Sequence, residues 1–264
     1  MTDETRHLNF KDIPNAARVY DYVLGGSCNY DADRQAAEFM LSLVPSTRKW
    51  VRYLRNFLHA TIRQLAAEGF DRFLDLASGL PTEDHIHTTA PGVNVVYVDI
   101  DPLVVQTGTE IIGNHPNARY MEADIRNIDE ILASPIVREM VGDGSKVAVG
   151  LNAVTCFLKE TEIQKIMHAL YQWAPTGSKL YATFETKIPD LMSPGLQQLI
   201  DTFAQMGSPY HFLTLEKSRE LVHPWMADAS GFQPLATVLG VESDVTDADR
   251  EGVGLEFYGA VLQK

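Results

Sequence analysis

Residues 72–85 read RFLDLASGLPTEDH, and this stretch decides the fold. An apolar run ends at Asp75, and a helix is expected to begin near Thr82. Three small residues form the turn between them: Ala77, Ser78 and Gly79. The pattern predicts a strand, a tight turn and a helix. Because small side chains leave backbone N–H groups and a helix N-terminus open to a ligand, the turn indicates a binding site.

A second stretch, NVVYVDIDP at residues 94–102, narrows the kind of ligand. Its β-branched and aromatic run predicts the next strand, which ends at Asp99. An acidic residue about twenty positions after a small-residue turn is placed to accept both hydroxyls of a ribose. Asp99 is that residue, and Asp101 is its nearest rival. The G-x-G-x-x-G pattern is absent, which disfavours an NAD-dependent dehydrogenase but also allows an ordinary strand-to-helix connection.

The rest of the chain alternates between predicted strands and helices, which favours an α/β fold with a mostly parallel sheet. Apolar periodicity predicts helices at 15–24, 32–42, 47–68 and 159–173. Five strands are expected at 72–76, 94–99, 118–122, 146–151 and 179–186. Two final strands, at 234–238 and 255–262, are expected around an acidic loop at 242–251. Ligands of such sheets bind at the carboxyl ends of the strands.

The composition of the chain limits the molecules that it is expected to bind and the compartment in which it is expected to work. The chain has 264 residues and a net charge of −13, which argues against nucleic acid, since its binding requires a basic face. Cys28 and Cys156 give no disulfide framework and fit a reducing compartment. No apolar run reaches the length of a membrane span, and the polar N-terminus is unlike a signal peptide. We therefore expect a soluble, cytoplasmic protein that acts on a small molecule, and we assign no metal ligands.

Three blocks of sequence carry a resemblance to a known family: IPNAARVYDYVLGGSCNYDADRQAAE at 13–38, FLDLASGLPT at 73–82 and VVYVDIDPLVV at 95–105. With them the chain resembles the class I S-adenosylmethionine-dependent methyltransferases. More narrowly, it resembles an actinobacterial S-adenosyl methyltransferase family once catalogued as a domain of unknown function. The resemblance implies a Rossmann-like sheet of seven mostly parallel strands with the last one antiparallel. It also implies one structural domain, in which a helical segment at 1–70 covers a cofactor-binding part at 71–264.

The resemblance assigns residues to the amino-acid end of S-adenosylmethionine. Asp75, Ala77 and Gly79 would line the turn beside it. Arg55 would supply the positive charge that the cofactor carboxylate needs, although a surface ion pair is the alternative. Asn152, just after the fourth strand, would lie at the mouth of the site.

The nucleoside end is assigned in the same way. Asp99 would hold the ribose, with Ile100 beside it. Asp124 would accept from the adenine amino group, and Ile125 would pack on the ring and offer its backbone N–H. Asp124 could instead cap the segment that follows it. Tyr22, on the first helix, is also predicted to contact the cofactor.

Methyl transfer to a small molecule, in specialised metabolism, is the predicted reaction. The candidates for a base are Glu185 at the end of the fifth strand, His211 and Tyr30. Several positions depart from the family: Ala77 stands where a glycine is usual, Ser27 and Cys28 where Lys-Asp is usual, and Cys156 where a histidine is usual, and the C-terminal third lacks the usual ending. These departures leave open a non-methylating use of the cofactor, such as hydrolysis or cyclisation, or a role as a binding subunit that supports a partner enzyme. A homo- or hetero-oligomer also stays open.

Overall fold

A β-sheet forms the centre of the protein in the computed structural model, which describes residues 10–81, 85–142, 144–188, 191, 193–205 and 209–264. Its strands run in the order β3-β2-β1-β4-β5-β8-β6, and β7 also pairs with β8. The strands are β1 (Arg72–Leu76), β2 (Asn94–Asp99), β3 (Ala118–Glu122), β4 (Ala148–Leu151), β5 (Lys179–Lys187), β6 (Met226–Ala227), β7 (Gln233–Pro234) and β8 (Leu255–Gln263). The pairings among β1 to β5 are parallel, whereas β8 is antiparallel to each of its neighbours. The predicted α/β fold with an antiparallel last strand is confirmed.

The sheet has one strand more than the seven expected, because two very short strands share one edge of β8. β6 pairs with Leu262 and Gln263, and β7 pairs with Tyr258 and Gly259. Each of the two strands has two residues. A strand of two residues has no alternation for a sequence pattern to detect.

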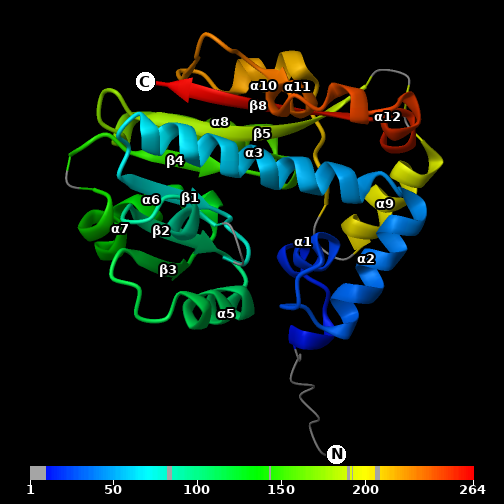
Figure 1. Ribbon diagram of the computed structural model, residues 1–264, viewed down its shortest axis with the longest axis horizontal. Coiled ribbons are helices and arrows are strands. Elements are labelled where there is room, and N and C mark those ends of the chain that lie inside the picture. The colour runs from blue at the N-terminus through cyan, green and yellow to red at the C-terminus, as the bar shows by residue number, and fades with distance from the viewer. Residues whose placement is uncertain (1–9, 82–84, 143, 189–190, 192, 206–208) are drawn as a thin grey trace, which may run out of the picture.

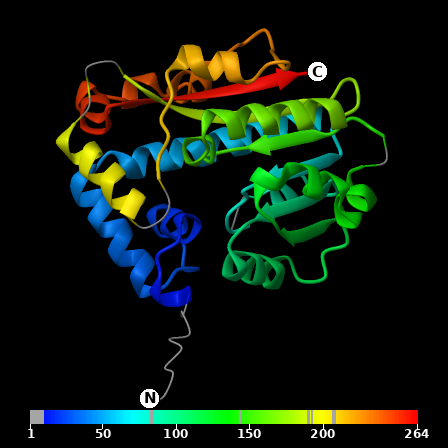
Figure 2. The same ribbon diagram turned by 180° about the vertical axis from the view of Figure 1, so that it is seen from behind.

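Helices cover both faces of the sheet, as the alternation of side chains along a strand requires. One face packs against α6, α7, α8 and α10, and the other packs against α3, α4 and α5. Figure 1 shows α3 across one face, and Figure 2 shows the opposite side of the molecule. The α-helices are α1 (Ala16–Leu24), α2 (Asp31–Leu43), α3 (Thr47–Ala67), α4 (Ile86–Thr89), α5 (Pro102–Ile112), α6 (Ile128–Ala133), α7 (Pro135–Met140), α8 (Glu160–Trp173), α9 (Pro194–Gln205), α10 (Leu215–Leu221), α11 (Leu235–Leu239) and α12 (Asp247–Val253). The 3₁₀ helices are η1 (Phe10–Asp12), η2 (Ile125–Asn127), η3 (Thr155–Phe157) and η4 (Glu242–Asp244).

The long helix α3 connects two hydrophobic cores. Its C-terminal half, with Leu58, Ile62 and Leu65, packs on the sheet. Its N-terminal half, with Trp50 and Leu54, packs in a second core with α1, α2 and α9. In Figure 1 these three helices lie beside the sheet rather than over it. The second core also contains the first residues of β8, so both ends of the chain contribute to it.

Two expectations for the C-terminal region are wrong. The predicted strand at 234–238 is mostly the helix α11, which ends at Gly240 in the left-handed conformation. Only part of its apolar run is buried, since Leu235 is inaccessible while Val238 is exposed. The acidic loop at 242–251 contains η4 and the start of α12, where Thr246 and Asp249 form a capping box. Acidic residues therefore stabilise a helix N-terminus here instead of marking an irregular loop.

The first residues of α4 and β4 also differ from the prediction. The helix expected near Thr82 falls partly outside the described residues, since 82–84 are not among them, and α4 begins only at Ile86. The fourth strand begins at Ala148, two residues later than expected. Within the described part of the chain, no helix combines the length and the apolar composition that a membrane span requires.

Candidate functional site

A cavity of about 610 Å³ lies where the carboxyl ends of β1, β2, β4 and β5 face the helices α1, α3 and α9. This volume is within the range of about 300 to 1,000 Å³ that is typical of small-molecule sites. Most of the residues that the sequence assigned to a site line this cavity: Arg55, Asp75, Ala77, Gly79, Asp99, Ile100, Asp124, Ile125, Asn152, Glu185 and His211. Tyr22 and Tyr30 do not line it. The parallel sheet explains the convergence, because its strands end at one edge.

The turn after β1 is held against β2 by hydrogen bonds. The Ser78 backbone N–H donates to the Val98 carbonyl at 2.9 Å, and the Ser78 hydroxyl donates to the Asp75 carbonyl at 2.7 Å. Ala77 and Gly79 both have positive φ angles, 56° and 64°. A left-handed alanine costs about 1 to 2 kcal/mol because its Cβ crowds the following carbonyl. The turn therefore keeps the backbone of a glycine turn although it carries a methyl group at position 77.

Asp75 is almost completely buried beneath this turn, with 3% of its surface exposed. Its Oδ1 accepts from the Tyr181 hydroxyl at 3.3 Å. Burial raises the pKa of Asp75 to about 7, although bonds from Ser78 and Tyr181 and the charge of Arg55 act in the opposite direction. Gly150 is required beside it, since a Cβ there would collide with Asp75 and Tyr181. With a pKa of about 7, the Asp75 carboxyl group gains or loses its proton close to neutral pH.

Asp99, at the end of β2, is held by the backbone on both of its oxygens. Oδ2 accepts from the Gly79 N–H at 2.9 Å, and Oδ1 accepts from the Asp101 N–H at 3.0 Å. Burial raises its pKa, and these two bonds oppose the rise. Each carboxylate oxygen can accept more than one hydrogen bond, so a diol can still bind.

Asp101, the alternative candidate for the ribose, has a structural role instead. Its Oδ1 caps α5 by accepting from the N–H groups of Leu103 and Val104. Its Oδ2 accepts from Asn15 Nδ2 at 2.8 Å and from Arg18 Nη1 at 3.2 Å. Asp101 therefore ties α1 to the edge of the sheet, and Asp99 is the carboxylate that lines the cavity.

Asp124 lines the cavity and also caps η2. Its Oδ1 accepts from the Arg126 N–H, and the Arg126 guanidinium lies 2.7 Å from Oδ2. The bond from the Arg126 side chain lowers the pKa of Asp124. Ile125, directly after it, is buried and faces the cavity. Capping and ligand contact do not exclude each other here, because one carboxylate offers several acceptor sites.

Buried polar atoms without partners mark the inner part of the cavity. Within the described chain, four residues that line the cavity have a buried polar atom without a hydrogen-bond partner: Trp50 Nε1, Arg55 Nη1, Asn152 Oδ1 and Glu185 Oε1. An unsatisfied buried polar atom costs about 1 to 3 kcal/mol, and more when it is charged. A ligand that carries a carboxylate and an ammonium group would satisfy the guanidinium and the amide oxygen.

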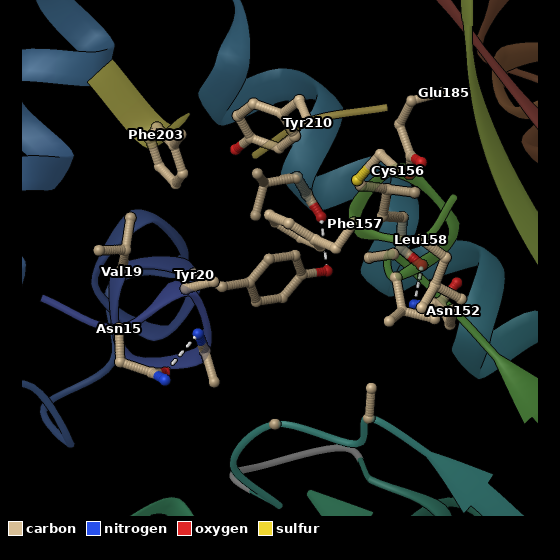
Figure 3. Close-up of a pocket in the computed structure, with 18 of the residues that line it drawn as sticks. Asn15, Val19, Tyr20, Asn152, Cys156, Phe157, Leu158, Glu185, Phe203 and Tyr210 are labelled. Atoms are coloured by element: carbon tan, nitrogen blue, oxygen red, sulfur yellow. Dashed lines mark hydrogen bonds between the residues drawn. The ribbon is translucent and has the colours of Figure 1, made fainter. Parts of the chain in front are cut away.

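The tyrosines of α1 are placed differently from the prediction. The Tyr22 hydroxyl donates to Glu38 at 2.7 Å on the exposed side of the helix. Tyr20 instead lines the cavity, where its ring lies 5.4 Å from the Arg55 guanidinium and its hydroxyl donates to the Val51 carbonyl. Figure 3 shows its side chain pointing inward from α1. Two residues advance a helix by more than half a turn, so only one of the two faces the cavity.

Sequence comparison assigns the chain to a family. Residues 2–240 match the S-adenosyl methyltransferase family. The chain belongs to this family. The match confirms the family, the cofactor S-adenosylmethionine and the class of enzyme that the sequence blocks implied. The protein is therefore an S-adenosylmethionine-dependent methyltransferase.

Solved structures of other S-adenosyl methyltransferases share this fold. A candidate methyltransferase from Thermobifida fusca is 28% identical, with a TM-score of 0.82 and 96% of both chains covered. A DUF574 family protein from Streptomyces avermitilis is 26% identical, with a TM-score of 0.82, 96% of this chain and 98% of that chain covered. A geranyl diphosphate C-methyltransferase from Streptomyces coelicolor, solved with S-adenosyl-L-homocysteine, is 10% identical at a TM-score of 0.53, covers 82% of this chain and 77% of its own, and shares the fold alone. None of the curated proteins matches the chain.

The three candidates for a base in this S-adenosyl methyltransferase differ in position. Glu185 lies in the wall of the cavity with 7% of its surface exposed, and burial raises its pKa. His211 also lines the cavity, where its backbone N–H donates to the Cys156 carbonyl at 2.6 Å. Tyr30 instead precedes α2, and its ring packs against Arg18. Of the three, Glu185 is the one with an unpartnered buried oxygen.

Sequence reasoning missed the apolar wall of the cavity in this methyltransferase. Aromatic side chains from η3, α9 and the segment after it contribute to it, including Phe157, Phe203 and Tyr210. Figure 3 shows these rings around the inner space. The residues are far apart in sequence and read as ordinary core residues, so no local pattern could have assigned them to a site.

Proposed function

We propose that this methyltransferase acts on a small molecule that binds in the same cavity as the cofactor. The observation that carries the proposal is the continuity of one cavity from Asp75 and Asp99 at the sheet edge to Glu185 near the end of β5. S-adenosylmethionine, when bound, supplies the methyl group. A nucleic acid would be repelled by the strong negative charge of the chain, whereas a cavity of about 610 Å³ can hold small molecules.

The amino-acid end of the cofactor is proposed to lie between Asp75, Arg55 and Asn152. The guanidinium can pair with a carboxylate, and the two acceptors can hold an ammonium group. In the turn between them, Ala77 and Gly79 let the backbone approach the ligand. These assignments rest on the burial of Asp75 and on the buried, unsatisfied side-chain atoms of Arg55 and Asn152.

The nucleoside end is proposed to lie over β2 and β3. Asp99 would accept both ribose hydroxyls, and Ile100 beside it is half exposed at the cavity rim. Asp124 and Ile125 would receive the adenine. In place of Tyr22, we assign Tyr20 as the tyrosine of α1 that faces the ligands.

The N-terminal helices are proposed to act as the cover of the site. Residues of α1, α2 and α3 line the cavity on the side away from the strands, and the bonds from Asn15 and Arg18 to Asp101 attach them to the sheet edge. A cover excludes water from the reacting groups, which strengthens the electrostatic interactions inside. A cytoplasmic location and a role in specialised metabolism stay predictions.

Calorimetry and mass spectrometry test the proposal together. The purified protein should bind S-adenosylmethionine and should leave it intact without an acceptor, and candidate small molecules should then yield S-adenosylhomocysteine and a methylated product. Homoserine and methylthioadenosine formed without an acceptor would instead indicate a hydrolase. Tight binding with turnover only after addition of a second protein would indicate a supporting subunit.

A further inference from the structure

The inner half of the cavity is an aromatic chamber, which we define by Trp50, Phe157, Phe203, Tyr210, Phe212 and Phe257. The Tyr210 ring lies 4.9 Å from Phe157, 4.8 Å from Phe203 and 5.0 Å from Phe212 between centroids. Trp50 and Phe257 stack at 4.7 Å. Rings that pack against one another at these distances form a preorganised apolar wall, against which a planar apolar ligand can pack.

Two polar groups interrupt this apolar surface: Trp50 Nε1, a donor without a partner among the described residues, and the buried carboxyl group of Glu185. Glu185 Oε2 accepts from the Thr155 hydroxyl at 3.5 Å, and the Cys156 thiol also bonds to this carboxyl. Oε1 has no partner among the described residues. Figure 3 shows Glu185 and Cys156 at one side of the chamber and Phe203 at the other. A buried acceptor of this kind favours a ligand that brings a hydrogen-bond donor.

We infer that the acceptor is a planar, mainly apolar molecule that carries a hydroxyl group, and that this hydroxyl donates to Glu185 Oε1 inside the aromatic chamber. The inference rests on the proposed function, because it assigns the second ligand of the same cavity. An acceptor carboxylate is disfavoured, since it would place two like charges in a buried site.

An acceptor amine is disfavoured for a different reason. A carboxylate beside an amine stabilises the protonated form, and an ammonium group has no lone pair with which to attack a methyl group. A hydroxyl keeps its lone pairs while it donates. In the transfer step the acceptor oxygen gains the methyl group, the cofactor sulfur keeps the electron pair of the broken bond, and the hydroxyl proton passes to Glu185 Oε1.

Three naphthalene probes of similar shape test the inference by calorimetry in the presence of S-adenosylhomocysteine. They are 2-naphthol, 2-methoxynaphthalene, which lacks the donor, and 2-naphthylmethylamine, which is a cation. We expect 2-naphthol to bind about tenfold or more tightly than 2-methoxynaphthalene. With S-adenosylmethionine, 2-naphthol should be methylated and the amine should not, because the carboxylate holds it as an ammonium group without a lone pair. In Glu185→Leu the preference of 2-naphthol over 2-methoxynaphthalene should vanish.

Binding of S-adenosylmethionine to the same preparations distinguishes a failure of the proposed function from a failure of the acceptor assignment. If the cofactor does not bind to the natural protein, the proposed function fails. If the cofactor binds but 2-naphthol does not, or if the amine is methylated and 2-naphthol is not, the acceptor class is wrong while the function stands. An unchanged preference in a Glu185→Leu variant that still binds the cofactor also overturns the assignment. A variant that loses the cofactor is replaced by Glu185→Gln, which keeps an acceptor atom and should retain the preference.

Discussion

Asp75 should make cofactor binding depend strongly on pH. Its pKa of about 7 comes mainly from burial, so about one-tenth of the unliganded protein carries this carboxylate at pH 6 and about one-hundredth at pH 5. A cofactor ammonium group requires the ionised form. We therefore expect the affinity for S-adenosylmethionine to fall about tenfold for each pH unit below 7, with one proton released per cofactor bound near pH 6.

The raised pKa of Asp75 also affects the stability of the protein without cofactor. Rising pH strengthens cofactor binding but lowers the free energy of unfolding. Because the folded carboxyl holds its proton up to about pH 7 and the unfolded one only to about 3.8, the folded state binds more protons between these values. The free energy of unfolding should thus decrease as pH rises through this window, by up to about 4 kcal/mol from this group. Binding of a cation to the ionised group restores the lost stability.

Calorimetry between pH 5 and 7, in two buffers of different ionisation enthalpy, measures both the affinity and the proton count. Asp75→Asn should bind more weakly at pH 7 and lose the pH dependence, and any titration of the cofactor itself affects both proteins equally. Asp71→Asn, on an exposed side chain, is the matched control and should behave like the natural protein. A constant affinity with no proton release in the natural protein would refute the reasoning.

Three further substitutions test other parts of the site. Asp99→Ala should weaken cofactor binding about tenfold to a hundredfold. An unchanged affinity of the folded variant, measured by calorimetry, would contradict the assignment of Asp99 to the ribose. Arg18→Ala leaves the buried Asp33 without its cation and should lower the free energy of unfolding by about 3 to 5 kcal/mol in denaturant titrations. The surface control Arg34→Ala should cost less than about 1 kcal/mol, and equal losses would contradict the buried network. Ala77→Gly should raise thermal stability, by about 0.5 to 1 kcal/mol after the glycine entropy is subtracted, whereas a decrease would argue against the left-handed turn.

The strand ends were predictable because their signals are local. An apolar run followed by Asp75 or Asp99 marks a strand and its carboxyl end without knowledge of the rest of the chain. Once the sheet is parallel, its topology alone brings these ends together. The sequence therefore predicted the polar edge of the cavity residue by residue.

The aromatic chamber and the choice between neighbouring tyrosines were not predictable in this way. Tyr20 and Tyr22 differ only in helix phase, which the packing of α1 against α3 determines. Tyr210 lies in a segment without regular secondary structure, and one of the rings against which it packs, Phe157, is more than fifty positions away. Such contacts depend on tertiary packing, so local propensity carries no signal for them.

The attachment of α1 to Asp101 has a consequence for how the protein is made. Asn15 and Arg18 leave the ribosome more than eighty residues before their partner, and Phe257, in the same cavity, follows more than two hundred residues after them. The first helices must therefore wait for distant segments before their apolar faces are covered. Contacts of such large sequence separation form slowly and expose apolar surface meanwhile. The apolar faces of α1 and α3 therefore stay uncovered while much of the chain is still being made.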